Sequence, residues 1–354
     1  MATNPEPEHA TPATEAPAAP APASAPANPI LEPDANTGDQ DSSDADSAFS
    51  AGLVSDTASI SSSILKFREE NGRTYSSFKA SAYFMPNDEI EKERLDLQHT
   101  MMLLLQDNRL HLCPAGKDKP MRRVLDAGTG TGIWAMDFAD ENPDTAVVGV
   151  DISPIQPAFV PPNVEFFVDD LEEEWNYTRP FDLIRLSNMT GSIRDWPKFF
   201  AQSYRHLAPG GWIEIMDPIN PPTSDDGTLT DKTALDKWGR LMSEAAAKLG
   251  SRLDSALGYE EQLAAAGFTG VVRTDYKWPS NTWPKDRLYK NIGAWNHENV
   301  LQGLHGFTVS LFTNVLGWSA AEVETFLIDV RKDLKNREIH AYWPARVIYA
   351  QKPL

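Results

Sequence analysis

The stretch Val124-Leu125-Asp126-Ala127-Gly128-Thr129-Gly130-Thr131-Gly132 decides the fold predicted for this chain. An apolar run enters a glycine turn, and the turn opens a segment with helical spacing. Glycines let the backbone approach a ligand closely and adopt torsions that side chains disfavour. The helix that follows would offer free N–H groups and the positive end of its dipole. The pattern predicts a binding loop, although a glycine-rich turn alone also suits a tight turn in another α/β protein.

The spacing of the glycines discriminates between cofactors. The run reads G-x-G-x-G, not the G-x-G-x-x-G of dinucleotide sites, and it lacks the Lys-Ser/Thr ending of a P-loop. Asp126 would repel a pyrophosphate and suits a ligand with an amino group and a sulfonium. Asp151 ends the next apolar run, 19 residues after Gly132, where a carboxylate can accept hydrogen bonds from a ribose diol. Asp170 follows the third run and is placed to accept from an adenine amino group.

Apolar strands alternate with helices around this turn, which predicts an α/β fold with a mostly parallel sheet buried on both faces. The expected strands are Arg123 to Ala127, Ala146 to Val150, Val164 to Val168, Phe181 to Leu186, Trp212 to Met216, Gly270 to Trp278 and Ala345 to Gln351. The expected helices are Asp88 to Leu112, Gly132 to Asn142, Asp195 to Leu207, Asp231 to Leu249 and Tyr259 to Ala266.

The chain divides into three parts by composition. Residues 1–60 are Pro/Ala-rich and then Ser/Asp-rich, so we expect a disordered tail that serves either as an interaction segment or as an inert spacer. Residues 61–120 are expected to form an N-terminal helical lid segment. Residues 121–354 would form the main domain, with a helical insertion at 281–340 that is a candidate lid or substrate wall.

Charge and composition exclude several classes of protein. The 354 residues carry a net charge of −19, and ten of the 51 acidic residues precede Lys66, the first lysine or arginine. The rest of the chain is therefore still acidic, at −9, which argues against direct nucleic-acid binding. The single cysteine, Cys113, excludes an intrachain disulfide framework, and the apolar runs are too short to span a membrane. We expect a location in the cytoplasm, the nucleus or both.

These residues resemble a known family. The segment from Val124 to Asp217 is similar to the core of class I S-adenosylmethionine-dependent methyltransferases, and Arg73 to the C-terminus is similar to the fungal LaeA-like methyltransferases. The narrower resemblance rests on Arg94-Leu95-Asp96-Leu97-Gln98-His99, Asp151-Ile152-Ser153-Pro154-Ile155-Gln156-Pro157, Val160-Pro161-Pro162-Asn163, Asp195-Trp196-Pro197, Pro209-Gly210-Gly211-Trp212, Asn281-Thr282-Trp283-Pro284 and His340-Ala341-Tyr342-Trp343-Pro344. The resemblance implies a seven-stranded Rossmann-like sheet with helices on both faces.

The resemblance also implies S-adenosyl-L-methionine as the cofactor and a role for each matching position. The methionine part would be held by residues at the glycine turn, namely Asp126, Gly128, Thr129 and Gly130. The nucleoside would be bound through the ribose by Asp151 and through the adenine by Ile152, Asp170 and Leu171. Ser187 and Asn188 would flank the methyl-bearing sulfur. Tyr75, Tyr83 and His99 would fold over the cofactor as a lid.

Methyl transfer from a sulfonium depends mainly on alignment, and a general base is needed only if the acceptor must lose a proton. No catalytic dyad stands out in the sequence. The candidate bases are Tyr75, His99, His297 and His305, for each of which a structural role is the alternative. Four tryptophans either wall a pocket near the sulfonium or belong to the core: Trp278, Trp283, Trp295 and Trp343. No metal is expected, because the acidic run at 169–174 suits a solvated loop better.

Three functions remain open at this point. The first is a methyltransferase that acts on a small molecule of secondary metabolism, which the aromatic-rich insertion favours. The second is a regulator of secondary metabolism of the LaeA type, acting through velvet-type protein partners. The regulator's usual turn is Gly-Cys-Gly-Thr-Gly, whereas this chain has Thr129 at the second position, which favours a paralogue. The third is a pseudoenzyme that binds the cofactor without transferring its methyl group.

Overall fold

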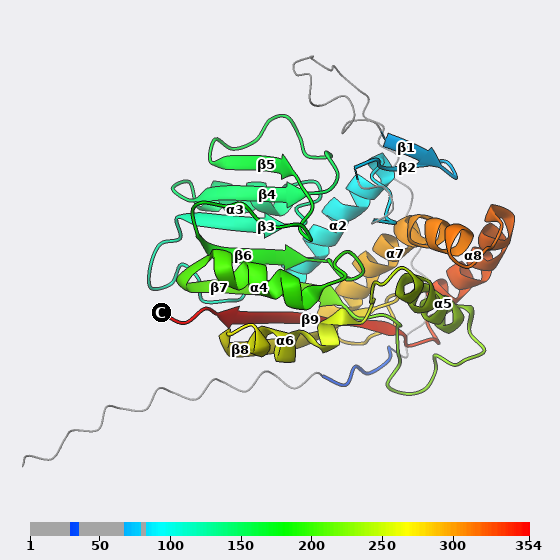
Figure 1. The fold of residues 1–354 in the computed structure, drawn as a ribbon. Helices are drawn as coiled ribbons and strands as arrows, with labels where there is room; N and C mark the ends of the chain where they lie inside the picture. Colours follow the sequence, from blue (N-terminus) through cyan, green and yellow to red (C-terminus); the bar gives the residue numbers. More distant parts are fainter. Residues whose placement is uncertain (1–28, 35–66, 79–82) are drawn as a thin grey trace, which may run out of the picture.

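A computed structural model describes residues 29–34, 67–78 and 83–354. Its centre is a seven-stranded sheet of order β5-β4-β3-β6-β7-β9-β8, in which β9 runs antiparallel to both of its neighbours and the other strands are parallel to one another (Figure 1). The strands are β3 (Arg123–Ala127), β4 (Ala146–Asp151), β5 (Val164–Val168), β6 (Phe181–Ser187), β7 (Leu207–Pro218), β8 (Thr269–Pro279) and β9 (Tyr342–Gln351). The predicted fold class is confirmed. The strand order reverses between β3 and β6, and open α/β sheets bind ligands at such a point.

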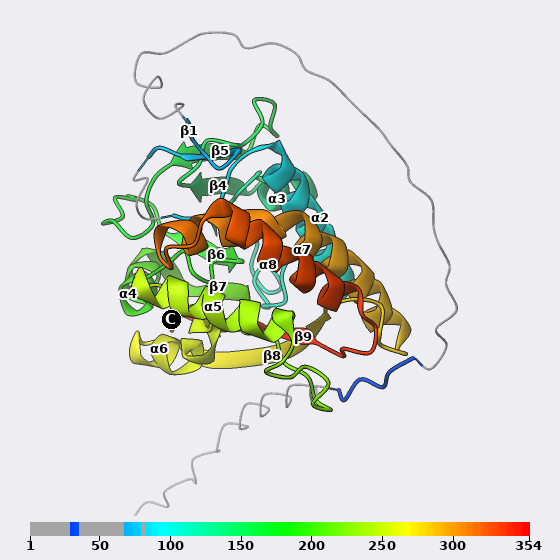
Figure 2. The same ribbon diagram turned by 90° about the vertical axis from the view of Figure 1, so that its right-hand side faces the viewer.

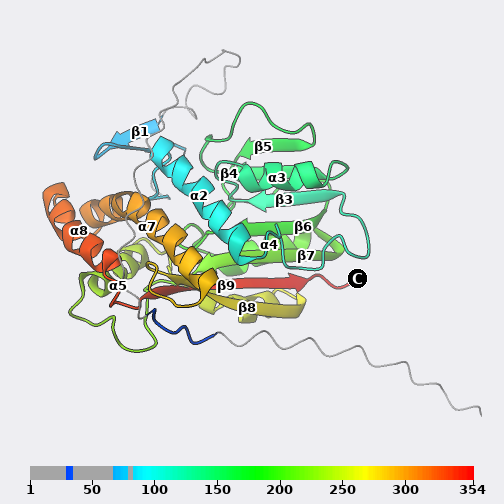
Figure 3. The same ribbon diagram turned by 180° about the vertical axis from the view of Figure 1, so that it is seen from behind.

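Helices cover both faces of the sheet, as expected for parallel strands with apolar residues on both sides. One face packs against α3 (Ile133–Glu141), whose Trp134 and Phe138 meet Val124 and Leu183 of the sheet. The opposite face packs against α4 (Trp196–His206) and α6 (Tyr259–Ala265), which follows the short helix η1 (Ser255–Leu257). Figures 1 and 3 show these two layers from opposite sides.

The remaining helices gather beyond the carboxyl ends of the parallel strands and form what we call the cap (Figure 2). The cap consists of α2 (Glu89–Leu105), α5 (Ala234–Lys248), α7 (Arg287–Asn314) and α8 (Ala320–Lys335). These helices share a hydrophobic core to which α2 contributes Met101, α7 contributes Leu304 and α8 contributes Leu327. The segment 281–340 is therefore helical, in α7 and α8. Every helix in the described ranges is too short or too polar to traverse a lipid bilayer.

The lid segment expected to be helical at 61–120 differs from the prediction in two ways. Its start, as far as it is described, is a hairpin of β1 (Phe67–Glu70) and β2 (Arg73–Ser76), joined by Asn71 and Gly72, which both have positive φ. An Asn-Gly pair is the signal for such a tight hairpin, and the prediction missed it. The helix expected to reach Leu112 ends at Leu105, because the backbone turns to positive φ at the following Asp107 and Asn108.

Residues 29–34, which we call the strap, lie inside the tail predicted to be disordered, but they pack on the body. Leu31 is buried against Trp283 and Tyr342. The amide of Lys285 donates to the carbonyl of Glu32 at 2.7 Å. The prediction of disorder therefore does not hold for the strap. The rest of the predicted tail, residues 1–28 and 35–60, lies outside the described residues.

Candidate active site

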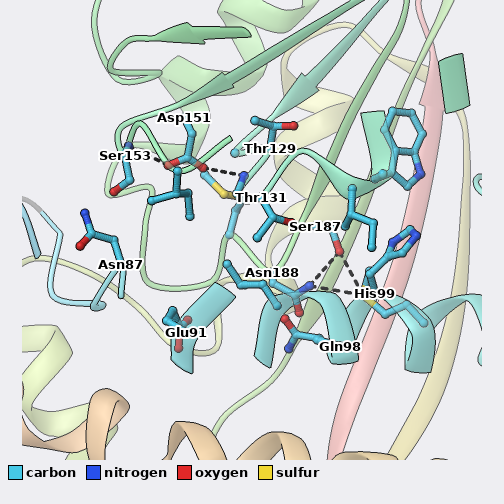
Figure 4. A pocket seen from close by; sticks show the side chains of 18 of the residues that line it. Asn87, Glu91, Gln98, His99, Thr129, Thr131, Asp151, Ser153, Ser187 and Asn188 are labelled. Atoms are coloured by element: carbon cyan, nitrogen blue, oxygen red, sulfur yellow. Dashed lines mark hydrogen bonds between the residues drawn. The ribbon is translucent and has the colours of Figure 1, made fainter. Parts of the chain in front are cut away.

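A cavity lies where the carboxyl ends of β3, β4 and β6 face the cap, and its empty space is about 730 Å³ when the part open to solvent is included. Figure 4 shows its walls: the glycine turn and Asp151 on the sheet side, and α2 with Glu91, Gln98 and His99 on the cap side. A second cavity, with about 490 Å³ of empty space including the part open to solvent, adjoins the first, since Tyr83, Gly128, Asp151 and Met189 line both. The first cavity thus lies at the ends of β3 and β6, between which the strand order reverses.

The glycine turn has the backbone that its sequence predicts. Gly128, Gly130 and Gly132 have φ values of 77°, 58° and 83°. The amides of Gly128 and Thr129 donate to the carbonyl of Val150 at 2.8 and 2.9 Å, which fixes the turn against β4. A Cβ on Gly128 would lie 2.1 Å from the sulfur of Met189, so a side chain there would displace a residue that lines the cavity.

Asp151 closes β4 at the junction of the two cavities. Its carboxylate accepts hydrogen bonds from the amides of Gly130, at 2.8 Å, and Ser153, at 2.9 Å. Burial raises the pKa of Asp151 to about 6, and the amide donors act against that rise. The Oγ of Ser153 is buried without a hydrogen-bond partner in the described part of the chain. A ligand with hydroxyl groups would satisfy both side chains, so this corner fits a ribose.

The residues predicted to bind the adenine lie together at the second cavity. Ile152, Asp170 and Leu171 all line it, beside Asp151. Leu171 is buried in the sheet core, whereas Asp170 lies on the loop that follows β5. An apolar face next to carboxylates and a backbone edge fits a planar, hydrogen-bonding base.

Asp126 does not lie where the prediction put it. Its carboxylate is buried beneath the turn and is absent from the lining of both cavities. It accepts from the hydroxyl of Thr129 at 2.6 Å and from Nη1 of Arg185 at 3.1 Å. Arg185 and Thr129 line the first cavity instead. The sequence could not indicate this arrangement, because it depends on the neighbouring strand β6.

Ser187 and Asn188, predicted to flank the methyl-bearing sulfur, lie at the end of β6 and line the first cavity. The amide nitrogen Nδ2 of Asn188 contacts Oγ of Ser187 at 3.0 Å and the sulfur of Met102 at 3.3 Å. Asn188 has a φ of 57°. Its Oδ1 is buried without a partner among the described residues. The contacts with Ser187 and Met102 fix the Asn188 side chain at this end of the cavity.

The sequence prediction missed most of the α2 wall. Glu91, Leu95, Gln98, His99 and Met102 share one helical face and line the cavity. Glu91 is held by a buried ion pair with Arg94, whose Nη2 lies 2.7 Å from its Oε1. The sequence did contain a signal for this wall. Polar and apolar residues alternate along one face of the predicted helix, and such a mixed face suits the wall of a site for a polar ligand.

Of the four candidate bases, one lines the first cavity and three lie elsewhere. His99 lines the cavity, and its Nε2 lies 2.8 Å from the carboxylate of Asp137, while burial lowers its pKa. Tyr75 is buried elsewhere, which raises its pKa to about 12. His305 faces Glu324 at 3.2 Å on the outer part of the cap, and His297 contacts the carbonyl of Ser280. Only His99 of these four contributes to the lining of the two cavities.

The tryptophans proposed for the pocket wall do not line either cavity. Trp278, Trp283 and Trp343 are buried in the core, and Trp295 is 38 % exposed. Trp134, at the start of α3, lines the first cavity instead. Tyr83, proposed as a lid residue, lines both cavities, and burial raises its pKa.

One group of possible metal ligands lies outside these cavities. Side-chain atoms of His111, Cys113 and Glu214 come within 4.8 Å of one another. The Glu214 carboxylate accepts from the amides of Leu112, at 2.8 Å, and Cys113, at 2.6 Å. Burial raises the pKa of both Glu214 and the Cys113 thiol. We attribute this cluster to anchoring of the loop after α2 on β7.

Known proteins are similar to most of the chain. The family described as "Methyltransferase domain" matches residues 97–273. Methyltransferase pytC of Aspergillus terreus is 40% identical over 300 residues, which covers 84% of this chain and 92% of that protein. Probable methyltransferase tdiE of Emericella nidulans is 38% identical and covers 83% of this chain and 92% of its own length. Protein-methionine methyltransferase laeA of Emericella nidulans is 34% identical, with 82% and 77% covered.

Proposed function

Because the chain belongs to the LaeA-like group of class I methyltransferases, we propose that it transfers a methyl group from S-adenosyl-L-methionine to a small molecule of secondary metabolism. The observation that carries this proposal is the pair of adjoining cavities at the carboxyl edge of the sheet. One cavity has the groups that suit a nucleoside. The other continues from the glycine turn to the α2 wall, where an acceptor has room to approach.

The proposed cofactor supplies a methyl group on a positively charged sulfur. Asp151 would accept hydrogen bonds from the ribose, and Ile152, Asp170 and Leu171 would enclose the adenine. The backbone of Gly128 and Gly130 would run along the methionine part. These residues act by orientation, since holding reactants in line removes much of the barrier to a displacement.

The cap would position the acceptor and exclude water from the reacting atoms. Asn188 lines the first cavity, and its side-chain amide is suited to hydrogen-bond an N–H or O–H of the acceptor. Where the acceptor must lose a proton, His99 is suited to take it, because its lowered pKa keeps the imidazole neutral near pH 7. Neither residue needs a metal for these roles.

Two alternatives would use the same cavities. One is methylation of a protein, which the 34% identical laeA supports by its name, or regulation of secondary metabolism, which relatives named as secondary metabolism regulators support. The proposal that such regulation uses velvet-type protein partners rests on the resemblance alone. The 40% identical pytC and 38% identical tdiE are named only as methyltransferases, and their higher identity favours the enzyme. The other alternative is a protein that binds the cofactor without transfer.

The deciding experiment uses S-adenosyl-L-methionine with an isotope-labelled methyl group. The full chain is incubated with this donor and a fungal extract separated into small molecules and proteins. Label in a small molecule is expected. Label in a protein would favour the regulatory alternative, and cofactor binding without label in either fraction would favour the pseudoenzyme. The Asp151→Ala variant serves as the control, because its weaker cofactor binding should reduce transfer into every fraction.

A further inference from the structure

Arg185 occupies an unusual place for a charged residue, in the middle of the sheet beneath the glycine turn. It lies on β6 directly beside Asp126 of β3, and its Nη1 is 3.1 Å from the Asp126 carboxylate. The guanidinium lies over the ring of Trp134, at 4.7 Å from its centroid. The side chain is only 8 % exposed, yet it lines the first cavity. The ion pair and the stacking fix the guanidinium at the edge of that cavity.

Most of the hydrogen-bonding capacity of Arg185 remains available. A guanidinium has five N–H donors, and Asp126 is the one hydrogen-bond partner of Arg185 within the described residues. None of its nitrogens is both fully buried and unpartnered, so the remaining donors reach the space of the cavity. The geometry leaves a fixed, planar donor fork at the edge of the first cavity.

The charges around the two cavities make Arg185 distinctive. It is the one lysine or arginine that lines either cavity in the described part of the chain. The other charged residues of the lining are acidic: Glu91, Asp151, Asp169, Asp170 and Glu172. A ligand with a carboxylate would therefore meet a single favourable position, and guanidinium forks bind carboxylates with two parallel hydrogen bonds.

We propose that Arg185 binds the carboxylate of the cofactor's methionine part, and that Asp126 is a positioning residue that acts through Arg185. This inference rests on the proposed function. It replaces the direct contact between Asp126 and the methionine part that the sequence predicted. The acidic residue before the turn then has a defined task, which is to hold the guanidinium against Trp134 with one side of its fork still free.

The test compares two ligands that differ by the carboxylate alone. S-adenosylhomocysteine and its decarboxylated analogue, S-adenosyl-3-thiopropylamine, are titrated calorimetrically into the full chain and its variants. The unchanged protein should bind S-adenosylhomocysteine about 10- to 100-fold more tightly than the analogue, the range expected for hydrogen bonds to a charged group. Arg185→Met should abolish this preference, by weakening S-adenosylhomocysteine and leaving the analogue within about twofold.

Two further variants keep the test decisive. Arg185→Gln covers the case in which the methionine variant does not fold. Arg123→Met is the matched control, because Arg123 also stacks on an aromatic ring, that of Phe181 at 4.2 Å, but does not line either cavity. It should keep the preference for S-adenosylhomocysteine. A preference that survives in the Arg185 variants, or an equal loss for both ligands, would overturn the assignment of Arg185 alone. Failure of the unchanged protein to bind either ligand would overturn the proposed function as well.

Discussion

The glycine turn and the cap build opposite sides of the same cavity in different ways. At the turn, the decisive contacts join residues that are close in sequence, as in the bond from the Gly130 amide to Asp151, 21 residues away. In the cap, they join distant segments, as in the bond from Arg94 to Asn299, 205 residues away. The cofactor side is therefore fixed by local sequence, whereas the acceptor side exists only once the whole chain has folded. Changes in the two regions should have different consequences.

The largest expected effect comes from the buried ion pair of the cap. Arg94→Met leaves the Glu91 carboxylate without its partner, and both side chains are only 4% exposed. Removing one member of such a pair should lower the free energy of unfolding by about 3–5 kcal/mol. Chemical denaturation followed by circular dichroism measures this change.

The matched control for that variant is Arg240→Met. Arg240 pairs with Asp236 on the surface of α5, where its side chain is 55% exposed. Exposed pairs of this kind contribute roughly 0.2–1 kcal/mol, so the control should unfold almost like the unchanged protein. If both variants lost equal stability, the Arg94–Glu91 pair would not hold the cap together.

The turn should respond to a single added methyl group. Gly132 has a φ of 83°, and a Cβ there would lie 2.3 Å from the ring of Phe166. Backbone strain and overpacking together predict that Gly132→Ala loses about 2–4 kcal/mol of stability. Gly72→Ala is the control, since Gly72 has a similar φ of 75° but open space around it. A loss in Gly72→Ala as large as in Gly132→Ala would mean that strain, not the contact with β5, governs the turn.

The same contrast explains what could be predicted from the sequence. The strands of the seven-stranded sheet and the glycine turn follow from local pattern. So do the positions of Asp151, Asp170 and Asn188, because each lies at or just beyond the end of a strand. The partner of Asp126 could not be predicted, since Arg185 reaches it only through the register of β3 and β6.

The cap was harder to predict for the same physical reason. Helical periodicity indicated that the insertion is helical, but it does not say which helix faces the cavity. The α2 wall became visible only through its packing on α7, to which Arg94 and Asn299 contribute. Of the four tryptophans for which wall and core were both open, Trp278, Trp283 and Trp343 are buried in the core, where burial of their large apolar rings is stabilising, and Trp295 is exposed.

Asp151 allows the cofactor side to be tested without disturbing the cap. Asp151→Ala removes an acceptor that the ribose would use, and should weaken S-adenosylhomocysteine binding by about 1–3 kcal/mol. Calorimetry measures the affinity, and thermal unfolding checks that the fold is retained. An unchanged affinity would remove Asp151 from the site.

Titration of Asp151 should change the affinity for S-adenosylhomocysteine less than its replacement by alanine does. Burial raises the pKa of Asp151 in the free protein to about 6. A bound ribose favours the ionised carboxylate, so affinity is full above pH 6 and falls as protonation competes below it. The affinity for S-adenosylhomocysteine should drop about tenfold between pH 7 and pH 5. Asp151→Asn should bind more weakly and lose this dependence. A slope that persists in the variant would assign the titration to another group.

The smallest expected effect concerns the strap, which tests how far the cap extends. Leu31 is 8% exposed, but it belongs to a short segment that can detach rather than leave a cavity behind. Leu31→Ala should therefore lower the free energy of unfolding by only about 1 kcal/mol, while hydrogen exchange at the Lys285 amide, which donates to Glu32, becomes faster. Ile30→Ala is the control, because Ile30 is 83% exposed and should change neither quantity. A loss of 3 kcal/mol or more in Leu31→Ala, of the order seen for core leucines, would instead make the strap part of the cap core, so that the acceptor side would depend on contacts reaching almost to the start of the described chain.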